Sequence, residues 1–292
     1  MRLKALFCVG CLLSALLCGC SQQEDVQVAA TTLPVYQFTS ALCEGTGIGV
    51  TRLITQQVSC LHDYSLNVSQ VRSLELAEVV VISGGGLEEF MEDSLEKAQY
   101  VIDSSQGIPL LECEEHHHGE ENKHHHHDQD AHIWLSPANA AMMAENIAQG
   151  LVHIYPDHQE QIQDNLIQLQ QELAALEAYG QQQLSELSCR EMITFHDGFG
   201  YLADAFELDI LKAIEEESGS EASARELKEM ITTVRQHQLP AIFTEVNGSV
   251  SAADIIGAET GVRVLALDMA MSEGDYFAAM YHNIDTIREA MG

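Results

Sequence analysis

Residues 79–83 read VVVIS. It is a continuous apolar run rich in β-branched residues, which is typical of a strand buried on both faces of a parallel sheet. Strand patterns flank it at 26–31, 50–54 and 100–103, with helical patterns at 34–42, about 69–77 and 87–97. Because strands alternate with helices, the first half of the chain is expected to form an α/β lobe built from βαβ units.

The same alternation returns in the second half. Strand patterns occur at 191–195, 208–214, 240–245 and 262–267, with helical patterns at 198–206, from Ser223 to about His237 and after each of the last two strands. Ser223 and Glu226 have the spacing of a capping box, which marks a helix start. A second α/β lobe is therefore expected.

A long helical region separates the two halves. Ser136 and Pro137 mark its start, and Pro156 interrupts it before leucines recur at helical spacing. About 30 helical residues would span about 45 Å, roughly the reach of two lobes. The expected fold is two parallel-sheet α/β lobes joined by one long rigid helix, with a site between them. The boundaries are 1–20 for a signal peptide, 26–155 for the first lobe, 156–187 for the linking helix and 188–292 for the second lobe.

Composition limits the function. The 292 residues contain 13 Lys and Arg against 45 Asp and Glu, a formal net charge of −32. Such a chain lacks the positive charge that nucleic acids and acidic substrates require, and it attracts cations instead. The 46% of hydrophobic residues argue for packed cores rather than a disordered chain.

The first 20 residues have the pattern of a targeting segment. Arg2 and Lys4 precede an apolar run from Ala5 to Leu17, which is shorter than the ~20 residues that a membrane span needs. The run ends in Leu17-Cys18-Gly19-Cys20, which resembles the bacterial lipoprotein signal box. That resemblance implies cleavage before Cys20 and lipid on its sulfur, with an ordinary secretory peptide as the alternative. The expected location is extracytoplasmic, anchored to the outer face of the cytoplasmic membrane.

The remaining cysteines do not suggest a zinc ribbon or a thioredoxin-type site, because none of them has CxxC spacing. They are Cys43, Cys60, Cys113 and Cys189. An oxidising compartment would allow disulfides, and four cysteines have three full pairings between which the sequence does not decide.

Candidate metal ligands fall near strand ends, where open α/β sheets bind their ligands. The first half contributes His62, after the second strand, and His132, before the long helical region. The second half contributes His196, directly after ITF, and Asp268, directly after VRVLAL. Three imidazoles and one carboxylate form a tetrahedral set suited to Zn²⁺. Glu245 also ends a strand, and it is expected to be either an alternative ligand or the acceptor that orients an imidazole.

A second metal-binding feature is the segment EEHHHGEENKHHHHDQD, residues 114–130. It has no apolar period, so it is expected to be a mobile loop rather than part of a core. Imidazoles and carboxylates bind borderline metals, and the loop ends just before His132. It is therefore interpreted as an auxiliary metal-capture loop, whose histidines are His116, His117, His118, His124, His125, His126 and His127.

Several blocks together resemble a known family. These six blocks are HDYSL, HIWLSPANA, ITFHDGFGYLADAF, IFTEVNGS, ETGVRVLALD and YFAAMYHNID. They are similar, in this order, to the blocks of the solute-binding proteins of zinc and manganese ABC importers. The zinc-uptake members with a histidine-rich loop are the most similar, and the resemblance covers nearly all of residues 26–292. It implies a metal buried between two lobes, with ligands at His62, His132, His196 and Asp268. It also implies a permease as partner.

These features favour a monomeric carrier that binds Zn²⁺ and is not an enzyme. An imidazole at position 196, where manganese members tend to have a carboxylate, favours zinc, although a manganese carrier on the same scaffold is the main alternative. An extracytoplasmic zinc hydrolase is a further alternative. It has little support, because four protein ligands would close the coordination sphere and the chain has neither HExxH nor GxSxG. An adhesin function on the same scaffold is also open.

Overall fold

The structure is a computed structural model that describes residues 27–56, 61, 64–112, 129–213, 222–271 and 274–292. Several predicted features lie outside the described residues. They are the signal peptide with Cys20, the predicted ligand His62, the cysteines Cys60 and Cys113, and all seven histidines of the capture loop. In the described part of the chain no helix is both long enough and apolar enough to cross a membrane.

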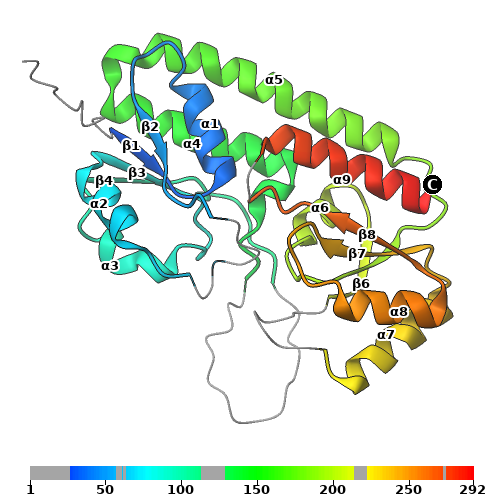
Figure 1. Ribbon diagram of the computed structural model, residues 1–292. Helices are drawn as coiled ribbons and strands as arrows, with labels where there is room; N and C mark the ends of the chain where they lie inside the picture. The colour runs from blue at the N-terminus through cyan, green and yellow to red at the C-terminus, as the bar shows by residue number, and fades with distance from the viewer. Residues whose placement is uncertain (1–26, 57–60, 62–63, 113–128, 214–221, 272–273) are drawn as a thin grey trace, which may run out of the picture.

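The first lobe is built on a four-stranded parallel sheet with the order β2-β1-β3-β4 (Figure 1). Its strands are β1 (Val28–Ala30), β2 (Val50–Arg52), β3 (Val79–Ile82) and β4 (Tyr100–Asp103). The helices of this half are α1 (Leu33–Leu42), α2 (Val68–Leu76), α3 (Glu92–Leu95) and α4 (Pro137–Ile154), with short 3-10 turns η1 (Glu89–Met91) and η2 (Ile133–Leu135). The strand predicted from VVVIS is confirmed as β3, which pairs with both β1 and β4 and whose three valines are fully buried.

The predicted helix 87–97 is wrong in extent. Gly84, Gly85 and Gly86 have φ values of 82°, 65° and 89°, so the chain turns sharply after β3. The carboxylate of Glu88 then folds back and accepts hydrogen bonds from the backbone N–H groups of Ser83 and Gly84. These contacts place Leu87 and Glu88 in a turn, and only the short η1 and α3 follow.

The second lobe repeats this architecture. Its parallel sheet has the order β6-β5-β7-β8, with strands β5 (Glu191–Thr194), β6 (Asp209–Ala213), β7 (Ala241–Glu245) and β8 (Arg263–Leu267). Its helices are α6 (Gly200–Ala205), α7 (Ala224–His237), α8 (Ser251–Thr260) and α9 (Tyr276–Met291). The capping box predicted at Ser223 and Glu226 is confirmed at the start of α7.

A long helix spans both lobes, as predicted. It comprises the 3-10 turn η3 (Pro156–His158) and α5 (Gln159–Gln183), and α5 packs against α1 and α4 of the first lobe and α9 of the second (Figure 1). Helix α5 ends at Gln183 rather than at the predicted residue 187. The Arg190 guanidinium donates hydrogen bonds to the carbonyls of Leu184 and Ser185, just after the helix, and so gives partners to carbonyls that a helix end leaves without them.

The disulfide question stays open. Cys43 is buried and Cys189 is partly buried, and within the described residues neither forms a disulfide. Cys60 and Cys113, with which they could pair, lie outside that part of the chain.

Candidate metal centre

The structure brings two of the predicted ligands together at the junction of the lobes. His132 lies in the first lobe directly before η2, and His196 follows β5 in the second lobe. Their Nε2 atoms are 3.4 Å apart, and the two rings are nearly perpendicular, at 88°. Two imidazoles 64 positions apart in the sequence therefore point their Nε2 atoms at the same place.

A carboxylate lies behind each imidazole. The Oδ1 atom of Asp130 is 2.8 Å from Nδ1 of His132, and the Oε1 atom of Glu245 is 2.9 Å from Nδ1 of His196. Both carboxylates are buried, each with about 6% of its side chain exposed. A buried carboxylate needs donors, so each holds a proton on the Nδ1 atom that it faces.

The position of Glu245 follows from strand register. β5 and β7 are neighbours, and Thr194 is paired with Phe243. Two residues after Thr194 comes His196, just past the end of β5, and two residues after Phe243 comes Glu245, the last residue of β7. The pairing of the two strands therefore brings the imidazole beside the carboxylate. Of the two roles predicted for Glu245, this contact matches the acceptor that orients an imidazole.

This protonation leaves two Nε2 lone pairs facing each other. Two such lone pairs repel at 3.4 Å unless a cation lies between them. In a tetrahedral site with metal–nitrogen bonds of 2.0–2.1 Å, two nitrogen ligands are about 3.3–3.4 Å apart. The imidazole pair therefore has the spacing of two ligands of one tetrahedral metal ion.

Gly198 makes this approach sterically feasible. A Cβ atom at this position would lie 2.6 Å from Cδ2 of His196 and 2.8 Å from Nδ1 of His132, which are distances that real side chains do not tolerate. Sequence reasoning missed both Gly198 and Asp130. The only available signals were the short spacing from Asp130 to His132 and from His196 to Gly198, and neither is specific by itself.

Asp268 lies at the carboxyl end of β8, as predicted. The Asp268 backbone N–H donates to Oδ1 of Asn283, and the Asn283 amide donates back to the Asp268 carbonyl. The carboxylate Oδ1 of Asp268 accepts a hydrogen bond from the backbone N–H of Ala270. The described residues contain no group of three or more His, Cys, Asp or Glu side chains arranged as a metal site. His62, the fourth predicted ligand, lies outside those residues.

The segment after Asp268 is fastened to the first lobe. The indole N–H of Trp134 donates to the Met269 carbonyl at 2.8 Å, and the Tyr276 hydroxyl donates to the Trp134 carbonyl at 2.8 Å. Arg52 donates to the Met271 carbonyl. The amide of Gln37 donates to the Gly274 carbonyl and accepts from Tyr276 N–H. Hydrogen bonds thus join the lobes beside the candidate centre, in addition to α5.

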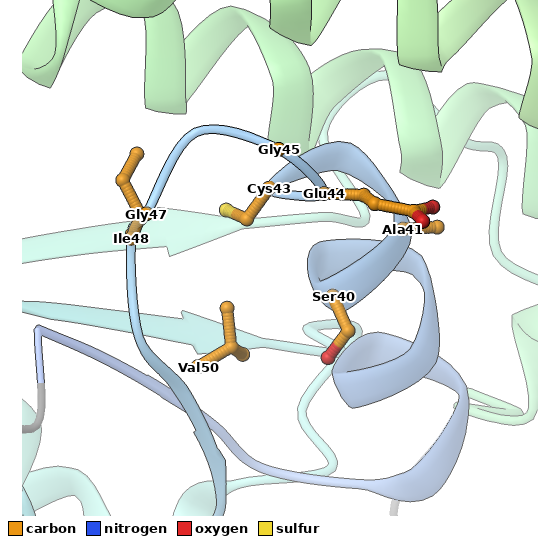
Figure 2. Close-up of a pocket in the computed structure, with 8 residues that line it drawn as sticks. All are labelled: Ser40, Ala41, Cys43, Glu44, Gly45, Gly47, Ile48 and Val50. Atoms are coloured by element: carbon orange, nitrogen blue, oxygen red, sulfur yellow. The ribbon is translucent and has the colours of Figure 1, made fainter.

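A cavity of about 570 Å³ lies elsewhere, at the C-terminal end of α1 and the start of β2 (Figure 2). Its lining residues are Ser40, Ala41, Cys43, Glu44, Gly45, Gly47, Ile48 and Val50. It opens at the amino ends of the strands, opposite the edge at which such sheets bind ligands. Burial raises the pKa of the Cys43 thiol to about 12, so the sulfur is not the thiolate that a metal requires.

The two lobes, the connecting helix and the junction site define a two-lobed solute-binding protein. Residues 28–290 match the family described as zinc-uptake complex component A, periplasmic, and the chain belongs to this family.

Individual relatives agree with this assignment. The chain is 29% identical over 286 residues to the high-affinity zinc uptake system protein ZnuA of Bacillus subtilis (strain 168), covering 93% of this chain and 89% of that protein. It is 27% identical over 296 residues to the zinc-binding lipoprotein AdcA of Streptococcus pneumoniae serotype 4, covering 96% of this chain but only 59% of the longer relative. A crystal structure of ZnuA superposes with a TM-score of 0.79 at 30% identity, covering 92% of this chain and all of that one.

Proposed function

We propose that this protein captures Zn²⁺ outside the cytoplasm and delivers it to the membrane permease of an ABC importer. The observation that carries the proposal is the pair of Nε2 atoms 3.4 Å apart, each imidazole backed by a buried carboxylate. The names of the relatives support zinc as the cargo. The net charge of −32 supports a cation over an anion.

In this proposal four protein groups hold the ion. His132 and His196 bind through Nε2, and His62 and Asp268 complete the set. Asp130 and Glu245 hold the two imidazoles in the metal-binding tautomer. Four protein ligands leave no open position for a water nucleophile, which favours a carrier over the hydrolase alternative.

The choice of zinc over manganese follows from the donor atoms. Imidazole nitrogens suit Zn²⁺, whereas Mn²⁺ prefers more oxygen ligands. Native mass spectrometry of the purified protein, loaded with Zn²⁺ and Mn²⁺ in competition, tests this directly. We expect one tightly held Zn²⁺ per chain in addition to weaker ions. Tight retention of Mn²⁺ instead would favour the manganese carrier, and no tightly held ion would overturn the proposal.

The histidine-rich segment is proposed to capture ions for the tight site. Its seven histidines and its acidic residues would bind Zn²⁺ weakly, and it ends at Asp130, two positions before His132. Deleting residues 115–129 should remove the weak ions and spare the tight one, and should slow zinc uptake only when zinc is scarce. Because this deletion also removes Gln129, a shorter deletion of 115–127 is the matched control for damage at the loop end. Loss of the tight ion in both deletions would show that the segment supplies a primary ligand.

A lipid anchor at Cys20 is proposed to keep the monomeric carrier at the outer face of the cytoplasmic membrane. The Leu17 to Cys20 box supports it. Cys20→Ala should stop lipidation, and Cys18→Ala is the matched control that leaves the acceptor intact. A Cys20→Ala protein that still partitions quantitatively with membranes in a processed form would contradict the anchor.

A further inference from the structure

Both ends of the histidine-rich segment return to one short antiparallel pairing, here called the stem, formed by residues 111–112 and 129–130. Glu112 and Gln129 form an antiparallel bridge, and the Asp130 N–H donates to the Leu111 carbonyl at 2.8 Å. In an antiparallel ladder, opposite pairs alternate between those that exchange two backbone hydrogen bonds and those that exchange none. Leu111 and Asp130 are the pair that should exchange two.

The second of these two bonds passes through a side chain of the other lobe. The hydroxyl of Tyr201, on α6, accepts a hydrogen bond from the Leu111 N–H at 2.9 Å and donates one to the Asp130 carbonyl at 3.0 Å. Its oxygen therefore stands between the donor and the acceptor that a regular ladder would join directly. Tyr201 is 3% exposed, so water does not replace this hydroxyl readily.

Asp130 also connects the stem to the candidate metal centre. Asp130 accepts hydrogen bonds on Oδ1 from both the backbone N–H and the Nδ1 atom of His132, each at 2.8 Å. Gly200, next to Tyr201, lies so close that a Cβ atom there would be 3.0 Å from Oδ2 of Asp130. Asp130 is thus held through its carbonyl by Tyr201 and holds His132 through its carboxylate.

We propose that Tyr201 is a positioning residue that holds the stem closed and, through Asp130, holds His132 in place at the metal centre. The inference rests on the proposed function, because it takes His132 as a ligand. With the hydroxyl in place, the N–H of Leu111 and the carbonyl of Asp130 are both held. Without it, the stem keeps one backbone bond at this pair, so Asp130 is held less firmly and orients His132 less well.

The test compares Tyr201→Phe in two backgrounds. The first is the full chain. In the second, residues 114–127 are replaced by Asn-Gly, a two-residue turn suited to closing an antiparallel hairpin, so the stem is held covalently and all seven histidines are removed. The measurement is the dissociation rate of Zn²⁺ from the tight site, followed by transfer to a chromogenic chelator. Removing an outer partner of a metal ligand typically costs 10–100-fold in affinity. Tyr201 acts one step further out, so we expect about 3–10-fold faster release in the full chain.

In the hairpin background the same substitution should change the release rate by less than ~2-fold, because the turn replaces the hydroxyl as the closure of the stem. Equal acceleration in both backgrounds would show that Tyr201 does not act by closing the stem, and no acceleration in either would overturn the positioning role. Tyr179→Phe is the matched control. It also removes a tyrosine hydroxyl, one that donates to Asp285 between α5 and α9, and it should leave the release rate unchanged even if it lowers the melting temperature. Failure of the proposed function would be recognised separately, because the unsubstituted protein would then hold no Zn²⁺ tightly.

Discussion

The two lobes each bury a glutamate at the carboxyl edge of their sheet, but they use it differently. In the first lobe, Glu88 is buried and accepts hydrogen bonds from Thr31, Ser83 and Gly84, all of the same lobe. In the second lobe, Glu245 is buried to a similar degree but faces the imidazole of His196. An acid whose donors all belong to its own lobe stabilises that lobe, whereas an acid whose donor is an imidazole at the junction fixes a metal-binding tautomer.

The two imidazoles show a related contrast. The acid behind His132 is Asp130, two residues away in the same loop. The acid behind His196 is Glu245, which is 49 positions further along the chain and is set beside it by the pairing of β5 with β7. One half of the centre is thus built by local sequence and the other half by sheet register.

Removing either imidazole should have the largest effect. The binding free energy of Zn²⁺ in sites with four protein ligands is about 10–16 kcal/mol. An equal share for each ligand is about 2.5–4 kcal/mol, which corresponds to roughly 100–1,000-fold in affinity. His132→Ala and His196→Ala should each weaken zinc by this amount in competition titrations. His196→Glu should weaken zinc less than His196→Ala and should improve manganese relative to zinc, because an oxygen replaces the nitrogen. If neither substitution at His196 changes zinc affinity by more than ~3-fold, His196 is not a ligand, and Glu245 takes its place in the proposed ligand set.

The contrast between the two glutamates gives a prediction on pH. Burial raises the pKa of Glu88 to about 7, above its ordinary value of 4.5, and its hydrogen bonds offset only part of this effect. Because the folded protein binds this proton more tightly, the stabilising contribution is complete below pH 4.5 and is lost as pH rises to 7. The unfolding free energy of the wild type relative to Glu88→Gln should therefore fall by at most about 3 kcal/mol between these pH values. Denaturant titrations at each pH measure it, and a constant difference would show that Glu88 is ionised throughout.

The two backing acids should differ in what their loss affects. Glu245→Gln should weaken zinc about 10-fold, and Asp130→Asn should do the same or more, within the 10–100-fold range typical of such partners. Asp130 also accepts from the backbone N–H of His132, a bond that Asn can keep and Ala cannot, so Asp130→Ala should lower the melting temperature more than Glu245→Ala. A loss at Glu245 as large as that of His196→Ala would mean that Glu245 binds the metal directly.

The smallest effect on zinc is expected at the contacts that fasten the lobes together. Gln37→Leu removes two hydrogen bonds to the segment after Asp268, at Gly274 and Tyr276. At about 0.5–1.5 kcal/mol per bond, the unfolding free energy should fall by about 1–3 kcal/mol. Zinc affinity should change by less than ~3-fold, since no ligand or backing acid is touched. A larger loss of zinc affinity would show that the position of Asp268 depends on the first lobe.

The architecture follows from local sequence patterns. The buried run at 79–83, the alternation of strands and helices and the leucine period after Pro156 were enough to predict two parallel-sheet lobes and their linking helix, because these signals are local. The sequence also placed His196 and Asp268 just after strands, and His132 before the long helical region. The extent of the helix predicted at 87–97 was wrong, because a side chain folding back onto its own turn leaves no periodic trace.

Which side chains meet at the candidate centre depends on how the strands and lobes pack. The pairing of Glu245 with His196 depends on β5 and β7 being neighbours in the sheet, and strand order is not encoded in the pattern of any single strand. The need for Gly198 arises from two imidazoles of different lobes approaching within 3.4 Å. The hydroxyl of Tyr201 matters because it lies between Leu111 and Asp130, about 90 and 71 positions away along the chain. Local patterns set the elements, whereas contacts across such separations form only when the lobes pack, and these contacts fix the tautomers and the spacing of the candidate ligands.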